Sequence, residues 1–257
     1  GGNVYYYRVG VIKGGSEVIG KEQKLFASTF VLVTGSYDKT VRKIDSDGNE
    51  IWTFSGNTNG VRAVTIDSNG YVYSGAMDNK VKKIDLNGNE VWTFNGNNNY
   101  VRGITHDLSG NVYSVSEDST VRKIDSDGNE VWNFYFNDHA LSVSYYDSHI
   151  YATSAITKVK KIDLNGNQVW STSTNGWAFN NTIDPINKYI YVGEQNSGIV
   201  KYDLNGNKIT QGNWPFSGHT NYVVSLVVDS NGYVYSGSAD NTVKKIDSDG
   251  NEVWTFT

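Results

Sequence analysis

The chain has 257 residues, of which 38% are hydrophobic, 13% aromatic and 19% charged, and its formal net charge is -5. This length suffices for one large domain or two small ones, and the low charge argues against a nucleic-acid-binding protein, which usually carries a basic patch. No apolar run approaches the roughly 18 residues that a membrane-spanning helix needs, and the absence of Cys excludes disulfides, Cys-ligated zinc and a thiol nucleophile.

Asparagine is unusually frequent, with 30 residues in the chain. Asn and Gly favour turns, whereas Tyr, Trp and Val favour strands. A chain rich in all five residue types is predicted to form many short strands joined by many turns.

The first 20 residues differ from the rest of the chain. Tyr5, Tyr7, Val9 and Val11 alternate with other residues, as one buried face of a strand does. This run resembles the penultimate strand of a fibronectin type III module, with Val11 where that family usually has Ala and Tyr5 as the candidate tyrosine corner. The resemblance implies that residues 1–20 end a preceding module and that the sequence belongs to a longer modular chain. The alternative is an extra strand of the domain that begins near Lys21.

From about Lys21 the chain repeats itself. The segment from Val41 to Trp52 recurs with starts at Val81, Val121, Val159 and Val243, and a degenerate copy from Ile199 has Thr210 in place of the Trp. The intervals between successive copies are 40, 40, 38, 40 and 44 residues, which gives six repeats. Repeats of this length form solenoids or propellers.

One repeat contains four short strands. Residues 61–66, 71–73, 80–84 and 90–94 alternate or are β-branched, and Asx- and Gly-containing turns separate them. Four short strands in about 40 residues are typical of a propeller blade, and no segment has a helical period. We therefore predict an all-β fold for residues 21–257, a six-bladed β-propeller of four-stranded antiparallel blades.

Two known repeat families resemble this pattern. The segment 84–92, Ile-Asp-Leu-Asn-Gly-Asn-Glu-Val-Trp, resembles the tryptophan-docking repeat of pyrroloquinoline-quinone-like propellers, in which the Trp docks between neighbouring blades. The segment 236–243 resembles the second turn of a WD repeat, and Gly218-His219 resembles the Gly-His pair of that family, in the last repeat alone. The family's Trp-Asp pair is replaced by Lys-Ile-Asp.

These resemblances imply the fold and little about function, because propellers host enzymes, scaffolds and binding proteins alike. A quinone enzyme resembling this family would need a longer chain and a dedicated acid-and-metal site. We therefore expect no cofactor.

The clustered carboxylates of residues 45–50, repeated at 125–130 and 247–252, raise the possibility of calcium binding. An EF-hand loop has Gly at its sixth position and Glu at its twelfth, whereas here Gly is fourth and no twelfth Glu follows. We predict a hairpin turn in which Asp caps the backbone and no metal site, with calcium as the alternative.

Other charged and titratable residues form no catalytic motif. Lys82-Lys83 and its equivalents recur beside an apolar Ile, and we predict a solvated charge ladder rather than a nucleic-acid-binding stripe. The four His residues share no spacing, and neither the zincin nor the nucleophile-elbow motif occurs.

Candidate ligand-binding residues come from variation between repeats, because sites on rigid repeat scaffolds lie where the copies differ. Alignment on the Asp that ends each first strand gives one set of equivalent positions, Gly60, Tyr100, Ala140, Trp177 and Tyr222. Two residues further on, the set is Arg62, Arg102, Ser142, Phe179 and Val224. The first strand of a blade is innermost, so these positions are predicted to gather near one mouth of the channel.

We select Tyr100, Trp177, Tyr222, Arg62 and Arg102 as candidate ligand-binding residues, because aromatic rings stack on sugars and arginines bind hydroxyls or carboxylates. Five residues belong to the same class of connection, namely Tyr135, Phe136, His139, Trp214 and Phe216. The alternative is that these aromatic side chains pack the channel or separate the blades.

The predicted function is that of a non-catalytic structural or recognition propeller at the C-terminus of a larger modular protein, with protein partners. Fibronectin-like modules leading into a propeller resemble phage tail and baseplate proteins or Gram-positive surface proteins, which implies a virion or extracellular location. One alternative is a glycan-binding module that recognises a cell-surface polysaccharide. The other is a polysaccharide-degrading enzyme, which needs facing carboxylates, with Asp138 and Glu194 as candidates. We expect neither nucleic-acid binding nor membrane insertion.

Overall fold

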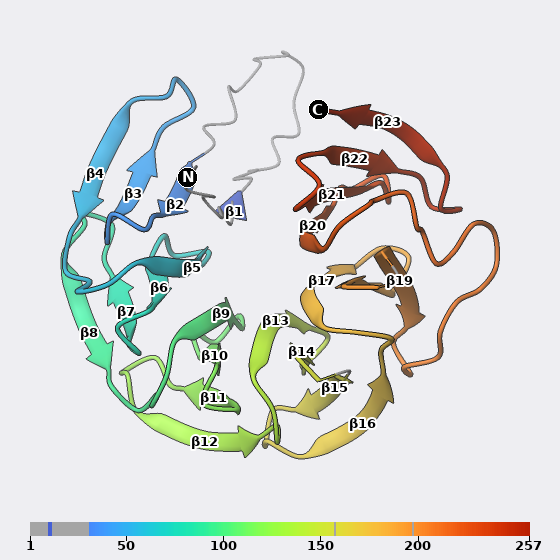
Figure 1. Ribbon diagram of the computed structural model, residues 1–257. Coiled ribbons are helices and arrows are strands. Elements are labelled where there is room, and N and C mark those ends of the chain that lie inside the picture. Colours follow the sequence, from blue (N-terminus) through green and yellow to red (C-terminus); the bar gives the residue numbers. More distant parts are fainter. Residues whose placement is uncertain (1–9, 12–30, 157, 197) are drawn as a thin grey trace, which may run out of the picture.

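The computed structural model describes residues 10–11, 31–156, 158–196 and 198–257, and every helix or strand within these ranges is a β-strand. Six antiparallel sheets follow one another around a ring, and in Figure 1 strands β5, β9, β13, β17 and β20 lie on its inner side. The predicted all-β, six-bladed propeller is confirmed. None of the described elements is a helix with the length and apolarity that a bilayer span requires.

Each sheet is one blade and takes its strands from consecutive sequence. Blade 1 contains β1 (Gly10–Val11), β2 (Leu32–Gly35), β3 (Val41–Ile44) and β4 (Glu50–Phe54). Blade 2 contains β5 (Val61–Ile66), β6 (Val72–Ala76), β7 (Val81–Ile84) and β8 (Glu90–Phe94). Blade 3 contains β9 (Val101–His106), β10 (Val112–Ser116), β11 (Thr120–Ile124) and β12 (Glu130–Tyr135).

The second half of the ring follows the same order. Blade 4 contains β13 (Ala140–Tyr146), β14 (His149–Ser154), β15 (Lys158–Asp163) and β16 (Gln168–Ser173). Blade 5 contains β17 (Ala178–Asp184), β18 (Tyr189–Glu194) and β19 (Gly198–Asp203). Blade 6 contains β20 (Val223–Val228), β21 (Val234–Ser238), β22 (Val243–Ile246) and β23 (Glu252–Phe256).

Asx-Gly turns fix the register of each blade. In blade 2 one carboxylate oxygen of Asp67 accepts the backbone N–H groups of Asn69 and Tyr71 at 2.9 and 3.0 Å, and the other accepts the hydroxyl of Tyr73 at 3.0 Å. Gly70 closes the turn at a φ of 86°, a conformation that glycine adopts without strain. The repeated Asn and Gly residues are therefore mainly turn chemistry, as the composition predicts.

The core lies between neighbouring blades and is joined by tryptophan. The indole N–H of Trp52 in blade 1 donates to the carbonyl of Leu86 in a turn of blade 2, at 3.0 Å. Four further joints repeat this bond at 2.9–3.0 Å, Trp92 to Ser126, Trp132 to Leu164, Trp170 to Leu204 and Trp214 to Ser248. The docking between blades that the family resemblance implies is thus present at five joints.

Blade 5 departs from the prediction of four strands, because its fourth strand is reduced to isolated bridges from Tyr202 to Lys208 and from Ile199 to Phe216. The chain continues past Thr210 and inserts Trp214, which is 4% exposed, at the joint with blade 6. The interval of 44 residues between the repeats that start at Ile199 and Val243 therefore contains a docking Trp at a shifted position, and the joint does not lack its Trp.

Two residues of the N-terminal segment are described. Gly10–Val11 forms β1 and pairs with β2 of blade 1. The other residues from which we predict a fibronectin-like strand, Tyr5, Tyr7 and Val9 among them, lie outside the described residues, and that interpretation stays a prediction.

Candidate functional site

The five candidate ligand-binding residues lie where the inner strands begin. Tyr100, Trp177 and Tyr222 directly precede β9, β17 and β20, and Arg62 and Arg102 are the second residues of β5 and β9. Because the inner strands occupy equivalent places around the ring, these residues lie toward one mouth of the ring, as predicted.

Three aromatic side chains come together there. The ring centroid of Phe179 lies 5.7 Å from that of Trp177 and 5.3 Å from that of Tyr222, so side chains of blades 5 and 6 meet. Trp177 is 49% exposed and Tyr222 is 41% exposed. We call Trp177, Phe179 and Tyr222 the aromatic platform. An exposed aromatic surface on rigid strands is suited to binding another molecule.

The other candidates are not brought to this platform. Arg102 forms an ion pair with Glu117 in its own blade, and the guanidinium of Arg62 lies 5.0 Å from the centroid of the Tyr37 ring. Tyr100 is partly buried at the start of blade 3. The two arginines are thus engaged by neighbouring side chains within their own part of the ring.

The structure corrects the alignment of blade 4. The N–H of Ala155 donates to the carbonyl of His139, as the N–H of Glu117 does to that of Tyr100. His139, rather than Ala140, is therefore the equivalent of Tyr100 in the first set. Leu141, rather than Ser142, is the equivalent of Arg102 in the second set. The cause is a two-residue hairpin turn, Asp147-Ser148, with positive φ at both residues, so Asp147 is not the equivalent of Asp67.

The remaining aromatic residues of these connections mostly pack the interior. Phe136, Trp214 and Phe216 are 3%, 4% and 6% exposed, which agrees with the packing alternative for them. Tyr135 is 63% exposed at the end of β12.

A polar cavity of about 300 Å³ adjoins the platform and was not predicted from the sequence. Its walls come from the connections of blades 5 and 6, and they include Gln195, Asn196, Gly198, Ser217, His219, Thr220 and Asn221. Asn221 precedes Tyr222 of the platform, and the N–H of Gln195 donates to the carbonyl of Trp177 at 2.9 Å. The side chains that can reach a ligand in the cavity carry amides and hydroxyls, which bind neutral polar ligands.

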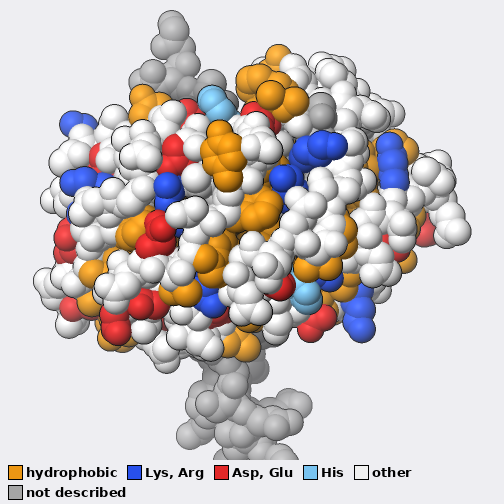
Figure 2. Space-filling view, turned by 90° about the horizontal axis from the view of Figure 1, so that it is seen from below, with side chains coloured by type: hydrophobic (Ala, Val, Ile, Leu, Met, Phe, Trp, Pro, Cys, Tyr) orange, Lys and Arg blue, Asp and Glu red, His pale blue; other side chains and the backbone are white. Residues whose placement is uncertain are grey.

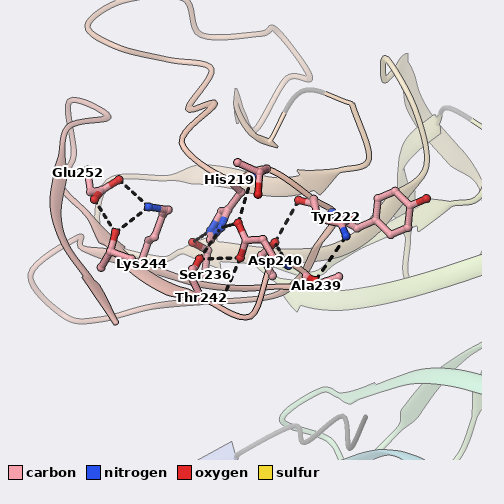
Figure 3. Close-up of polar contacts among 12 residues, drawn as sticks. His219, Tyr222, Ser236, Ala239, Asp240, Thr242, Lys244 and Glu252 are labelled. Atoms are coloured by element: carbon pink, nitrogen blue, oxygen red, sulfur yellow. Dashed lines mark hydrogen bonds and ion pairs between the residues drawn. The ribbon is translucent and has the colours of Figure 1, made fainter. Parts of the chain in front are cut away.

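Beneath this cavity His219 is held in a buried hydrogen-bond network (Figure 3). Its Nδ1 lies 2.9 Å from the Asp240 carboxylate and its Nε2 lies 2.7 Å from the Ser236 hydroxyl. The order Asp, His and Ser is that of a hydrolytic triad. Ser236 is fully buried, however, and the His219 side chain has no exposed surface, so a substrate cannot reach this hydroxyl. The network fixes the connection that leads to Tyr222.

The same position carries Asn in two other blades. Asn57 and Asn97 follow a Gly just as His219 does, and they are 4% and 5% exposed. Asn97 accepts a hydrogen bond from Arg122 at 2.9 Å. Asn57 and Asn97 are therefore packed within the connections that lead to the inner strands, rather than exposed to solvent.

The acidic turns use their carboxylates to bind the backbone. One oxygen of Asp45 accepts the N–H groups of Asp47 and Asn49 at 2.9 and 2.8 Å, and the other accepts the Asn49 side chain at 3.1 Å. Among the described residues no group of three or more His, Asp or Glu side chains is arranged to hold a metal ion. The geometry at these turns is that of the predicted hairpin cap.

These hydrogen bonds make stability depend on pH. The backbone N–H of Asn49 holds the pKa of Asp45 below its usual value. Burial would raise the pKa of Asp240, but hydrogen bonds from Thr242, the Thr220 N–H and His219 outweigh it, and the pKa is well below the usual range. A carboxylate whose pKa is depressed by folding stabilises the fold above its unfolded pKa, near 4, and loses that contribution as the pH falls through the folded pKa.

We therefore expect the urea midpoint of unfolding to be steady at neutral pH and to fall progressively below about pH 4. Asp240→Asn should lower the midpoint at pH 7 and make its further fall in acid shallower. Equilibrium unfolding followed by circular dichroism at pH 7, 4 and 3 measures both effects. A midpoint that does not change between pH 7 and pH 3 would contradict this account.

The predicted solvated charge ladder is wrong on both faces of the third strand, because Lys82 on one face and Lys201, which stands at the position of Lys83 on the other face, are both buried. Lys82 is 5% exposed and its ammonium lies 2.7 Å from Glu90, and Lys201 is 6% exposed and lies 4.0 Å from the centroid of the Tyr189 ring. These side chains bury their aliphatic portions between blades and pair their charges there. On the side of the ring seen in Figure 2, basic and acidic side chains are interspersed.

The two carboxylates considered for a polysaccharide-degrading enzyme also hold connections together. Asp138 accepts the N–H groups of His139 and Ile156. Glu194 is 1% exposed and accepts the hydroxyl of Tyr202 at 3.1 Å. Both side chains are already engaged in the loops that shape the mouth of the ring.

Comparisons with known proteins agree with this architecture. The family model described as outer membrane protein assembly factor BamB matches residues 37–256. No curated protein matches the chain. Among solved structures, the computationally designed protein Ika8 is similar with a TM-score of 0.73 and 19% sequence identity, over 88% of this chain and 71% of that one. At this identity the likeness shows the propeller fold alone.

Proposed function

The chain belongs to the propeller family described as outer membrane protein assembly factor BamB, and we propose that it is a non-catalytic protein-interaction propeller that binds through its aromatic platform. The description of the family model names an assembly factor, which favours an interaction role.

The observation that carries the proposal is the exposure of the platform on a rigid frame. Trp177 and Tyr222 present 49% and 41% of their surface at the start of two inner strands, while Phe179 packs between them. Tyr and Trp are the residues most enriched in the energetic centres of protein interfaces, because they bury a large area at a small cost in side-chain entropy.

Four polar side chains near this mouth that could perform chemistry are engaged in contacts within the described part of the chain, which supports a non-catalytic role. His219 and Ser236 are buried in the network below the cavity, and Asp138 and Glu194 accept hydrogen bonds within loops. Their contacts stabilise the connections, while the rings of Trp177 and Tyr222 remain exposed.

A photo-crosslinking residue at position 177 tests the proposal. Benzoylphenylalanine there should crosslink one defined protein from the source cells or particles, while the same residue at position 186 should not. Ile186 is a matched control because it is 60% exposed and lies in blade 5, but in the turn at the opposite end of β17. Equal labelling from both positions, or none from position 177, would contradict the proposal.

A neutral glycan is the second candidate ligand, favoured by the polar cavity beside the platform. The amides of Gln195, Asn196 and Asn221 can bind hydroxyls while the aromatic faces stack on sugar rings. Titration with neutral cell-wall oligosaccharides should change the intrinsic Trp fluorescence with saturation, and Trp177→Ala should weaken binding at least about tenfold. Ile186→Ala should leave it unchanged. A flat titration, or equal binding by the Trp177 variant, would exclude this ligand class.

We also propose that the chain acts in a larger modular protein at a virion or cell surface. The support is the resemblance of the segment from Tyr5 to Val11 to a fibronectin type III strand. Protease added to intact source particles or cells should cleave the protein. Full protection of the chain until the particles or cells are lysed would contradict a surface location.

A further inference from the structure

Four blades repeat one ion pair between their third and fourth strands. A basic side chain of the third strand meets a glutamate of the fourth, at N···O distances of 2.7–3.7 Å, in the pairs Arg42–Glu50, Lys82–Glu90, Arg122–Glu130 and Lys244–Glu252. In blade 2 the hydroxyl of Thr93 bonds both partners, donating to Glu90 at 2.6 Å and accepting from Lys82 at 2.7 Å. Blade 6 has the same arrangement with Thr255. An ammonium and a hydroxyl thus form a built site for one carboxylate.

Blade 4 retains the cation and the hydroxyl of this site but not the carboxylate. Lys160 stands where blade 2 has Lys82, and Ser171 lies opposite it on the fourth strand, as the threonine does in blade 2. The position of the glutamate is occupied by Gln168, which is neutral. Lys160 forms no ion pair with any of the residues that the structure describes. Its charge is therefore uncompensated within that part of the chain.

The turn before the third strand of blade 4 lacks a second carboxylate. In blades 1 and 3, Asp38 and Asp118 pair with the arginines at 2.7 and 2.8 Å. The equivalent residue of blade 4 is Ile156, because the two turns make matching backbone hydrogen bonds to the preceding connection. Blade 4 instead has a second cation, since Lys158 is two residues before Lys160 and therefore lies on the same face of β15.

The Lys160 ammonium is held in place and can be reached from solvent. Its Nζ lies 4.5 and 5.0 Å from the ring centroids of Phe136 and Phe134, and 3.5 Å from the Phe136 carbonyl. Burial and, to a smaller extent, the charge of Lys158 lower the pKa of Lys160, and a bound anion would act in the opposite direction. Lys160 is only half-buried, Ser171 is exposed, and β16 is the outermost strand of the blade (Figure 1).

We propose that Lys160, Lys158 and Ser171 bind a side-chain carboxylate from an acidic segment of a partner protein. The carboxylate takes the place that glutamate occupies in blades 2 and 6, where it accepts from an ammonium and a hydroxyl. A protein segment is the favoured source, because the group that fills the equivalent sites is itself a protein side chain. The site belongs to blade 4 and does not depend on the function proposed for the aromatic platform.

An NMR titration of the labelled chain with an end-blocked hexaglutamate peptide tests the site. At low ionic strength the peptide should cause saturable shift changes in the amides of β15 and β16, whereas hexaglutamine should cause none. The formal net charge of -5 repels an acidic peptide from the molecule as a whole, so binding depends on local positive charge. Lys160→Met keeps the aliphatic part of the side chain and should weaken binding at least about tenfold.

Gln168→Glu is the sharpest variant, because it restores within blade 4 the carboxylate that the equivalent sites contain. The new side chain should occupy the site and weaken peptide binding at least about tenfold. Gln211→Glu is the matched control, since it adds the same charge at an exposed residue in the connection between β19 and β20 and should leave binding unchanged. Circular dichroism verifies that the variants fold.

Equal peptide binding by the Gln168→Glu and Gln211→Glu variants would contradict the proposal, as would a titration without saturable shifts in β15 and β16. Competition identifies the chemistry of the ligand. Sodium acetate should displace the peptide at lower concentration than sodium chloride does. Equal displacement by the two salts would mean that the site has no preference for carboxylates, and would overturn the assignment.

Discussion

Trp214→Ala is expected to lower the free energy of unfolding by about 3–5 kcal/mol. Trp214 is 4% exposed, its ring centroid lies 5.2 Å from that of Tyr191, and its N–H donates to the Ser248 carbonyl at 2.9 Å. Truncation leaves a cavity between blades 5 and 6 and an unpaired carbonyl in the turn. Urea denaturation followed by circular dichroism measures the loss.

Trp177→Ala is the matched control for that variant. It removes the same side-chain type, but Trp177 is 49% exposed and donates no hydrogen bond within the described residues. The expected loss is below about 1 kcal/mol, as for a surface substitution. Equal losses for the two variants would show that the docked position carries no special stability.

Asp107→Ala is the substitution with the second largest expected effect, about 3 kcal/mol. Asp107 is 5% exposed and accepts four hydrogen bonds, at 2.8–2.9 Å, from the N–H of Ser109, the N–H and side chain of Asn111, and the hydroxyl of Tyr113. Removal of the carboxylate leaves these donors without a partner, and the Tyr113 hydroxyl is buried. The same urea experiment measures the effect.

The control lies in the outer turn of the same blade. Asp125 also accepts backbone N–H groups, from Asp127 and Asn129, but it is more exposed and binds no tyrosine hydroxyl. Asp125→Ala should cost clearly less, because water can replace the lost acceptor. Equal losses would mean that the buried hydroxyl adds nothing to the role of the Asp.

Much of the blade could be predicted from the repeated pattern. The expected strands at residues 61–66 and 90–94 coincide with β5 and β8. Blade 5 could not be predicted in full. The repeat has Thr210 where the other copies have Trp, and Trp214, four residues further along the chain, docks on the next blade instead. This substitution is visible only from the hydrogen bond of the Trp214 side chain. A pattern aligned by position cannot identify a residue that reaches the same place from a different loop.

The candidate site was predicted in part. Trp177 and Tyr222 meet through Phe179, which belongs to the second predicted set, whereas Arg62 and Arg102 are engaged by Tyr37 and Glu117. Those partners lie in other turns, so strand periodicity carries no signal for them.

The burial of the basic residues could not be predicted from the strand pattern. Alternation along a strand identifies two faces but does not show whether either face is covered by a neighbouring blade. In a propeller both faces of a blade contact neighbouring blades, so Lys82 and Lys201 are buried and satisfied by Glu90, Thr93 or a turn carbonyl. The interleaved packing of blades, rather than the strand pattern, decides the environment of a side chain.

Tryptophan joins the blades at five joints, and we propose that Trp177 has a second role as part of a recognition surface. Hydrogen exchange of the indole N–H groups, read by NMR after assignment with Trp→Phe variants, tests it in one experiment on the seven Trp residues. We expect slow exchange at the five docked positions, Trp52, Trp92, Trp132, Trp170 and Trp214, and fast exchange at Trp177. Exchange at the docked positions as fast as at Trp177, or protection of Trp177 itself, would contradict it.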